Sequence, residues 1–196
     1  YFNNNEYLES IQINNCSNLE VLSINHGLLE DNEKTLSSLS INNCTSIKDI
    51  SIGFTKITNL NFSNYSNLET LSIANNQLTN LDVSYCSNLK DLFCEDNQLT
   101  SLNISGCSNL ENLLCFNNQL INLDINSCFN LQQLWCWNNM LTSLNASSNS
   151  ALYSLVCRNN QMTNLNLQNG NNTIFTTIST ENNLQLGCIR VDDATW

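Results

Sequence analysis

Apolar residues recur along this chain in a short pattern that predicts β-strands. In the stretch LQQLWCWNN, which begins at Leu131, Leu134 and Cys136 occupy alternate positions. Trp135 and Trp137 fall at the positions between and after them. Because successive side chains of a strand point to opposite sides, the two tryptophans should face away from the residues that form the core.

This pattern returns every 21 residues. At that spacing the position of Cys136 is filled by Ile52, Ile73, Cys94, Cys115 and Cys157. A second half-repeat of the form LxxLxVxxC lies between successive copies, as in LTNLDVSYC at residues 78–86. Both halves have the alternating apolar positions of a strand. A fixed period of this length indicates a solenoid, because each unit buries its apolar residues only by stacking on its neighbours.

The segment LKDLFCEDNQLTSL, residues 89–102, resembles the conserved segment of leucine-rich repeats. The forms LDVSxC and LxCxNNQ are similar to 21-residue repeats of secreted and surface proteins of Bacteroidota, and the resemblance extends over roughly residues 8–191. It implies a mainly β, right-handed leucine-rich-repeat solenoid of about eight coils, with two short parallel strands per coil and little or no helix. Such repeats are binding scaffolds with varied partners, so the resemblance implies a binding module and names no partner.

The unbroken repeat predicts one domain, with the solenoid over residues 1–183 and a capping segment at residues 184–196. Residues 1–7 are expected to form a lead-in. The second coil begins 28 residues after the first, so seven extra residues fall in a loop at residues 26–35. That loop is either a tolerated surface insertion or a binding loop. A final strand is expected at residues 188–191, because a repeat array needs a cap over its last apolar layer.

Charge and the start of the chain bear on localisation. The opening YFNNNEYLES is polar and unlike a signal peptide, and no apolar run is long enough to span a bilayer. We therefore expect a mature or trimmed form of a protein that the resemblance implies to be secreted or on the cell surface. The net charge of -11 argues against a nucleic-acid partner, which requires a basic surface, and suits a soluble exported protein.

Candidate catalytic and metal-binding residues are few. The one histidine, His26, lies in the inserted loop and matches no catalytic or metal-ligand spacing. Five glycines form no phosphate-binding loop. Asp192 and Asp193 are adjacent, but two carboxylates are weak evidence for calcium and suit a solvated cap better. The sequence predicts no enzyme activity, no cofactor and no metal site.

Most of the ten cysteines fall into two rows at the repeat spacing. One row replaces an inward Leu or Ile of the LxxLxC strand, at Cys94, Cys115, Cys136 and Cys157. The other occupies an inward turn position, at Cys44, Cys86, Cys107 and Cys128, and is interrupted by Tyr65 and Asn149. Stacked side chains run parallel, which opposes the dihedral angle of about 90° in a disulfide, and no CxxC-like pair indicates zinc. We expect buried free thiols, and the redox state of Cys16 and Cys188 is left open.

Asparagine recurs at a further position of each repeat, at Asn76, Asn97, Asn118, Asn139 and Asn160. We expect these amides to lie inside the turns and to bond backbone groups of adjacent coils, which would otherwise be buried without partners. Their predicted role is structural.

The outward positions of the two strands differ in character. On the LxxLxV strand the middle outward residue is small and polar in every coil, at Ser40, Asn61, Asp82, Asn103, Asp124, Asn145 and Asn166. We interpret this side as a solubility face. On the LxxLxC strand four successive coils place apolar side chains outward. One row holds Phe93, Leu114, Trp135 and Val156, and the other holds Phe116 and Trp137 between the charged Glu95 and Arg158. Polar residues, Asp91 among them, border these rows.

An apolar, aromatic centre with a polar rim is the usual composition of a recognition surface. The predicted partner-binding residues are Asp91, Phe93, Glu95, Leu114, Phe116, Trp135, Trp137, Val156 and Arg158. Two interpretations are open. The surface binds an extracellular protein or a glycan stacked on the rings, or it packs against another domain or a second copy in a homodimer. The family resemblance favours recognition, because leucine-rich repeats usually bind through this strand.

Overall fold

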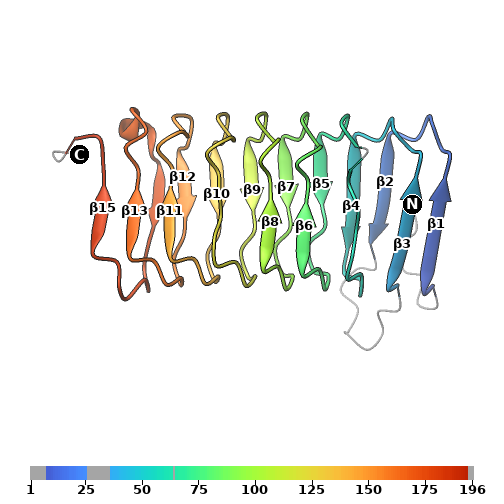
Figure 1. The fold of residues 1–196 in the computed structure, drawn as a ribbon, viewed down its shortest axis with the longest axis horizontal. Coiled ribbons are helices and arrows are strands. Elements are labelled where there is room, and N and C mark those ends of the chain that lie inside the picture. Colours follow the sequence, from blue (N-terminus) through green and yellow to red (C-terminus); the bar gives the residue numbers. More distant parts are fainter. Residues whose placement is uncertain (1–7, 26–35, 64, 194–196) are drawn as a thin grey trace.

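The computed structural model describes residues 8–25, 36–63 and 65–193. The expected lead-in at residues 1–7 and the inserted loop at residues 26–35, with His26, lie outside the described residues. The coils stack along a rod, with strands side by side on two faces (Figure 1). Within the described ranges the one helical turn is η1, a 3-10 helix at Asn172–Ile174. None of the described helical structure is long or apolar enough to cross a membrane.

One face is a continuous parallel sheet with a strand from each of eight coils. Its strands are β2 (Val21–Asn25), β4 (Asp49–Gly53), β5 (Thr70–Ser72), β7 (Asp91–Phe93), β9 (Asn112–Leu114), β10 (Gln133–Trp135), β12 (Ser154–Val156) and β14 (Thr177–Ser179). Equivalent residues pair, so Leu92 lies beside Leu113 and Leu113 beside Leu134. The predicted solenoid of parallel strands with almost no helix is confirmed.

The opposite face is divided into three separate sheets. They are formed by β1 (Ser10–Asn14) with β3 (Ser38–Asn42), by β6 (Asn80–Asp82) with β8 (Ser101–Asn103), and by β11 (Ser143–Asn145), β13 (Asn164–Asn166) and β15 (Cys188–Arg190). Residues 59–61 and 122–124 occupy the equivalent positions in the two intervening coils but form no strand. The second strand of the repeat is therefore absent from these two coils.

Two large inward side chains lie at the first interruption. Phe62 and Tyr65 stand where the next coil has the smaller Val83 and Cys86. Both rings are buried, and they pack edge to face with centroids 6.1 Å apart. Extra volume in a close-packed interior displaces the backbone around it. The two rings lie beside residues 59–61, which form no ladder with β3.

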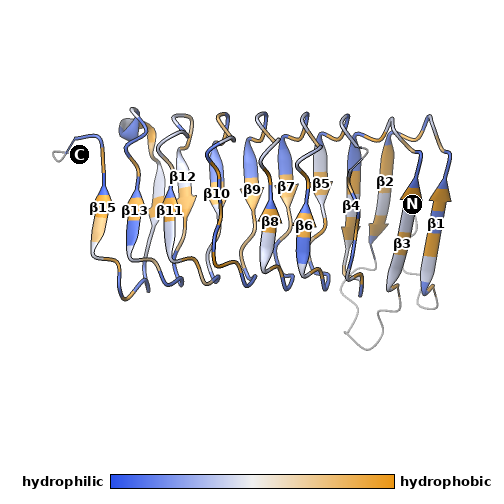
Figure 2. Ribbon diagram, in the orientation of Figure 1, coloured by the Kyte–Doolittle hydropathy of each residue, from blue (hydrophilic) through white to orange (hydrophobic). Residues whose placement is uncertain are grey.

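The core is a single column of apolar side chains that runs the length of the rod. Polar and apolar residues alternate within each coil, so both kinds recur from end to end (Figure 2). The inward asparagines lie among these residues, as predicted. Asn118 Nδ2 donates to the carbonyls of Cys94 at 3.0 Å and Cys115 at 3.2 Å, while its Oδ1 accepts the Leu99 N–H at 2.9 Å. Each such amide joins its own coil to the preceding one.

All ten cysteines are free, and eight of them are buried, as expected, whereas Cys16 and Cys188 are exposed. In the interrupted row the side chain from Tyr65 onward donates to the carbonyl 24 residues earlier, and Cys44 donates to the Ile13 carbonyl, 31 residues earlier across the insertion. Cys107 Sγ lies 3.3 Å from the Val83 oxygen. Tyr65 Oη donates to Ile41 at 2.9 Å and Asn149 Nδ2 to Ile125 at 3.1 Å. The position therefore requires a donor, which explains why a phenol and an amide can replace the thiol.

The polar outward residues of the second half-repeat have a structural role that the sequence analysis missed. Asp82 Oδ1 accepts the backbone N–H of Ser84 at 2.9 Å, and Asn103 Oδ1 accepts that of Ser105 at 3.2 Å. Hydrogen bonds from Ser84 lower the pKa of Asp82. These bonds are the local side-chain turns that Asp and Asn favour. The solubility face therefore also fixes the turn that follows each strand.

The last strand, β15, pairs in parallel with β13. The strand ends at Arg190, one residue before the expected Val191. Asp192 then accepts the backbone N–H groups of Gly170 at 3.0 Å and Asn172 at 3.2 Å. Its carboxylate thus binds the turn that leads into η1.

We expect only Cys16 and Cys188 to react with iodoacetamide at neutral pH in the native protein. The thiolate is the reactive form, and burial raises the pKa of Cys86, Cys107 and Cys157 to about 12. Intact mass after alkylation should show two labels in the native state and ten after denaturation. Rapid native labelling of further thiols, or a mass that indicates disulfides, would contradict the buried rows.

Candidate functional site: the aromatic face

The continuous sheet brings the first predicted row together. Phe93, Leu114, Trp135 and Val156 are paired neighbours at the ends of β7, β9, β10 and β12. All four are partly buried. The Trp135 Nε1–H donates to the hydroxyl of the buried Ser154 at 3.3 Å. This bond fixes the Trp135 ring toward β12.

The second predicted row forms a column of stacked groups. The Phe116 and Trp137 rings are stacked, with centroids 4.4 Å apart and planes 9° from parallel. The Arg158 guanidinium lies 5.0 Å from the centre of a Trp137 ring. Each group thus shields its neighbour, and the two rings are only partly exposed. We call Phe93, Leu114, Phe116, Trp135, Trp137 and Val156 the aromatic patch.

Glu95 stands in the same row as Phe116, one coil earlier. Its side chain is half-buried, and Oε2 has no hydrogen-bond partner among the described residues. Burial raises the pKa of Glu95, and the negative charge of the adjacent Asp96 raises it further. A backbone hydrogen bond lowers the pKa in part, but the net direction is upward, so the carboxylate carries a desolvation cost that this contact does not fully offset.

A row of one carboxylate and three amides borders the patch beyond the stacked column. It runs through Asp96, Asn117, Asn138 and Asn159, which have backbone φ between 51 and 54°. Asn117 Nδ2 donates to Asp96 Oδ1 at 2.7 Å, and Asn138 Nδ2 donates to Asn117 Oδ1 at 2.8 Å. The sequence predicted a polar border to the two rows but not this linkage between its side chains. The recurring asparagines were the available signal, because Asn tolerates the left-handed region.

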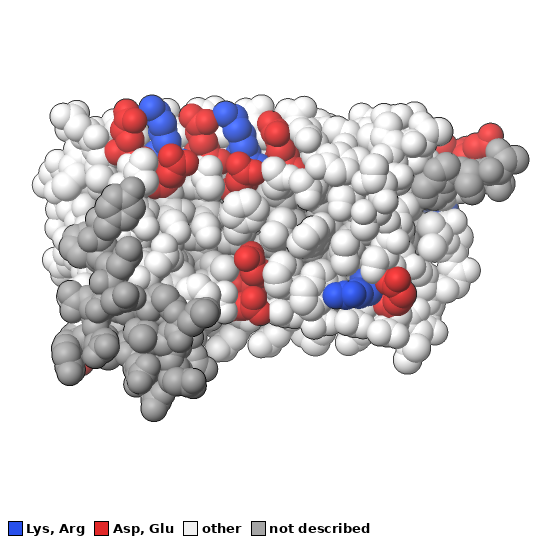
Figure 3. Space-filling model, turned by 180° about the vertical axis from the view of Figure 1, so that it is seen from behind, with Lys and Arg blue, Asp and Glu red and all other residues white. Residues whose placement is uncertain are grey.

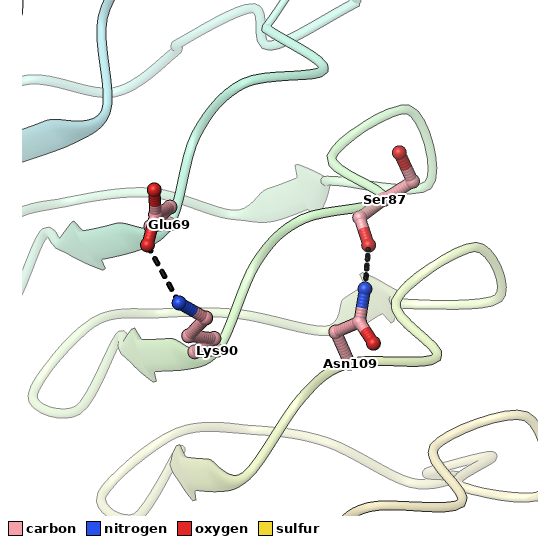
Figure 4. Close-up of polar contacts among 4 residues, drawn as sticks. All are labelled: Glu69, Ser87, Lys90 and Asn109. Atoms are coloured by element: carbon pink, nitrogen blue, oxygen red, sulfur yellow. Dashed lines mark hydrogen bonds and ion pairs between the residues drawn. The ribbon is translucent and has the colours of Figure 1, made fainter.

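Charged residues follow one edge of this face, and the sequence analysis also missed them. Basic and acidic side chains alternate along the upper edge in Figure 3, and the area below has few charges. Lys48 Nζ lies 3.3 Å from Glu20, one coil apart. Lys90 Nζ lies 2.7 Å from Glu69 of the preceding coil (Figure 4). Hydrogen bonding to Lys90 lowers the pKa of Glu69. These exposed pairs contribute little energy, and they gather most of the charge of this face at its edge (Figure 3).

The chemistry of this face is that of a contact surface. In the described part of the chain no group of three or more His, Cys, Asp or Glu side chains could hold a metal ion. The predicted residues are instead rings, aliphatic groups and single charges on neighbouring coils. Such an arrangement can exclude water and fix a partner, which are the requirements of recognition.

Comparison with known proteins bears on the fold. Residues 66–106 match the family described as leucine-rich repeats, in two copies. A leucine-rich-repeat protein of Leptospira interrogans superposes with a TM-score of 0.65 at 22% identity, over 83% of this chain and 49% of its own. The chain folds as a leucine-rich-repeat solenoid. The search of curated proteins gives no significant match.

Two Listeria monocytogenes structures are also similar to this leucine-rich-repeat solenoid. The functional domain of InlJ, described as including a cysteine ladder, has a TM-score of 0.62 at 23% identity, over 94% of this chain and 53% of its own. The internalin InlF has a TM-score of 0.61 at 19% identity, over 90% and 57%. This chain spans about half the length of these relatives. The resemblance to leucine-rich repeats is confirmed, and the assignment to the Bacteroidota type stays a prediction.

We expect Glu95→Gln to stabilise the solenoid at neutral pH, because an amide lacks the desolvation cost of the carboxylate. A carboxyl whose folded-state pKa is raised binds its proton more tightly in the folded state. Its unfavourable contribution therefore grows as pH rises through the ordinary value of 4.5 and is absent below it. Thermal melts should show a higher Tm for the variant at neutral pH and similar values in acid.

Glu9→Gln, at an exposed residue away from the patch, is the matched control and should leave the melting temperature unchanged. A Glu95→Gln protein that melts below the wild type at neutral pH would show that the carboxylate has a stabilising partner.

Proposed function

We propose that this leucine-rich-repeat solenoid is a secreted or cell-surface module, not an enzyme, that binds a protein partner through the aromatic patch. The observation that carries the proposal is the position of the patch on the continuous eight-stranded sheet, between a polar amide row and a charged edge. Partly exposed aromatic residues at the centre of a polar rim tend to dominate binding energy. Leucine-rich repeats are generally binding modules, which supports the same conclusion.

The ring geometry favours a protein over a glycan at this patch. A sugar stacks on the open face of an aromatic ring. Phe116 and Trp137 already cover one face of each other, and Arg158 lies over Trp137. This stacking leaves less open ring face for a sugar at Phe116 and Trp137, and the neighbouring aliphatic groups suit the side chains of a protein partner.

The charges near the patch favour a partner with basic side chains at the end formed by β7. Asp91, Glu95 and Asp96 lie there, and Glu95 Oε2 lacks a partner among the described residues. A lysine or arginine of the partner would neutralise this carboxylate. The net charge of -11 would also accelerate encounter with a basic surface.

The buried thiols are compatible with export. Eight of the ten cysteines are buried, and burial raises the pKa of Cys115 and Cys136 well above the ordinary range. Thiols in this state resist the oxidation that an extracellular compartment imposes. The cysteine rows are therefore compatible with secretion without disulfides.

The double variant Trp135→Ala, Trp137→Ala should lose partner binding and keep the fold, because neither ring belongs to the buried core. Removal of central aromatics often costs about 2 kcal/mol or more, a loss of about thirtyfold in affinity. Wild type and variant should be compared by surface binding to extracellular proteins, by glycan array and by size-exclusion chromatography. Phe129→Ala, at a side chain 59% exposed outside the patch, is the control and should bind normally.

The outcomes separate the interpretations. A variant that unfolds would place the rings in the core. A wild-type dimer that becomes monomeric in the variant would make the patch an assembly surface, and glycan binding lost in the variant would replace the protein partner by a sugar.

A further inference from the structure

A groove of about 850 Å³ opens on the interrupted face, away from the aromatic patch. Its walls are β3 and residues 58–63, and Tyr85 of the following coil also lines it. The groove lies where residues 59–61 fail to form a strand. Its volume is within the range of small-molecule sites, roughly 300–1,000 Å³.

The lining of the groove is entirely uncharged. It consists of Ser, Thr and Asn side chains together with a few apolar and aromatic groups. This is notable in a chain with 17 acidic residues, two of which, Asp82 and Asp124, lie on the same face. A ligand selected by charge would find no partner here, whereas hydroxyl and amide groups can both donate and accept hydrogen bonds to a neutral polar ligand.

The edge of β3 adds backbone groups to the groove. The Ser38 N–H donates to the Glu9 carbonyl at 3.2 Å, and the Asn42 carbonyl accepts the Asn15 N–H at 2.9 Å. Both bonds lie on the side of β3 that faces β1. Backbone groups alternate in direction along a parallel strand, so those of Leu39 and Ile41 face the groove. No described strand pairs with this edge. The Ile41 carbonyl accepts instead the Tyr65 hydroxyl at 2.9 Å.

Tyr85 supplies an aromatic surface at the groove. Its side chain is 61% exposed, and it stacks on no other ring in the described residues. It therefore differs from Phe116 and Trp137, whose faces cover each other. An exposed tyrosine ring offers an apolar face for packing and a hydroxyl for hydrogen bonding.

We propose that this groove binds a neutral oligosaccharide, with one sugar packed on Tyr85 and its hydroxyls bonded to Ser, Asn and the free edge of β3. Both the uncharged polar lining and the open ring suit this ligand class. A peptide strand added to β3 fits less well, because Tyr65 already occupies the Ile41 acceptor and the opposite wall is not a strand. The proposal is independent of partner binding at the aromatic patch.

Saturation-transfer NMR with the intact chain tests the proposal. The probes are hexasaccharides of β-1,4-glucose, α-1,4-glucose, xylose and N-acetylglucosamine, with an acidic galacturonate hexamer and a neutral octapeptide of alternating Ser and Val as rivals. At least one neutral sugar should bind the wild type. Tyr85→Ala should weaken that binding by about tenfold or more. Asn59→Arg, which adds bulk and charge at an exposed lining residue, should abolish it.

Two controls locate the site. Phe129→Ala removes an aromatic ring of similar exposure outside the groove, and Trp135→Ala, Trp137→Ala alters the aromatic patch, so both should keep sugar binding. Thermal melts check that each variant folds. If Tyr85→Ala does not fold, Asn59→Arg alone tests the groove. The proposal is wrong if no neutral sugar binds, if both groove variants bind normally, or if only the peptide binds. Sugar binding lost only in the tryptophan variant would place a glycan on the aromatic patch instead.

Discussion

The structure depends on inward asparagine amides that hydrogen-bond successive coils. A coil without helix turns its backbone sharply and leaves carbonyl and N–H groups inside, where each must find a partner. Asn97, Asn118, Asn139 and Asn160 each donate to a carbonyl 24 residues earlier and to one three residues earlier. Each also accepts an N–H from the preceding coil. One residue type thus satisfies the turn and sets the spacing of the stack.

Because the coils are coupled from inside, the outward residues are free to differ. The same backbone carries an aromatic patch on one face and short polar side chains on the other. The two surfaces differ further because the ladder is continuous on one face and interrupted on the opposite one. Continuous pairing aligns the rings for stacking, whereas the interruption beside Phe62 and Tyr65 opens a groove. The two proposed functions therefore follow from one scaffold with different degrees of backbone pairing.

Much of the fold was predictable from periodicity, because a strict period leaves little choice of register. The inward cysteines and asparagines were placed correctly, and Trp135 and Trp137 do leave the core. The stacking of Phe116 on Trp137 was not predictable, because it depends on rotamers across neighbouring coils. The groove was missed for a related reason. A large residue at an inward position can be absorbed by repacking or can displace a strand, and the sequence of Phe62 and Tyr65 does not decide between them.

Urea unfolding of Asn118→Ala beside Asn122→Ala tests the central claim most directly. The first variant removes an inward amide that hydrogen-bonds to Cys94, Cys115 and Leu99. The second removes the exposed amide of Asn122, nearby in the sequence. The amide account predicts that Asn118→Ala lowers the free energy of unfolding by about 1–3 kcal/mol, because it leaves buried backbone groups without partners. Asn122→Ala should stay within about 0.5 kcal/mol of the wild type. Equal stability of the two variants would contradict the dependence of the solenoid on its inward asparagines.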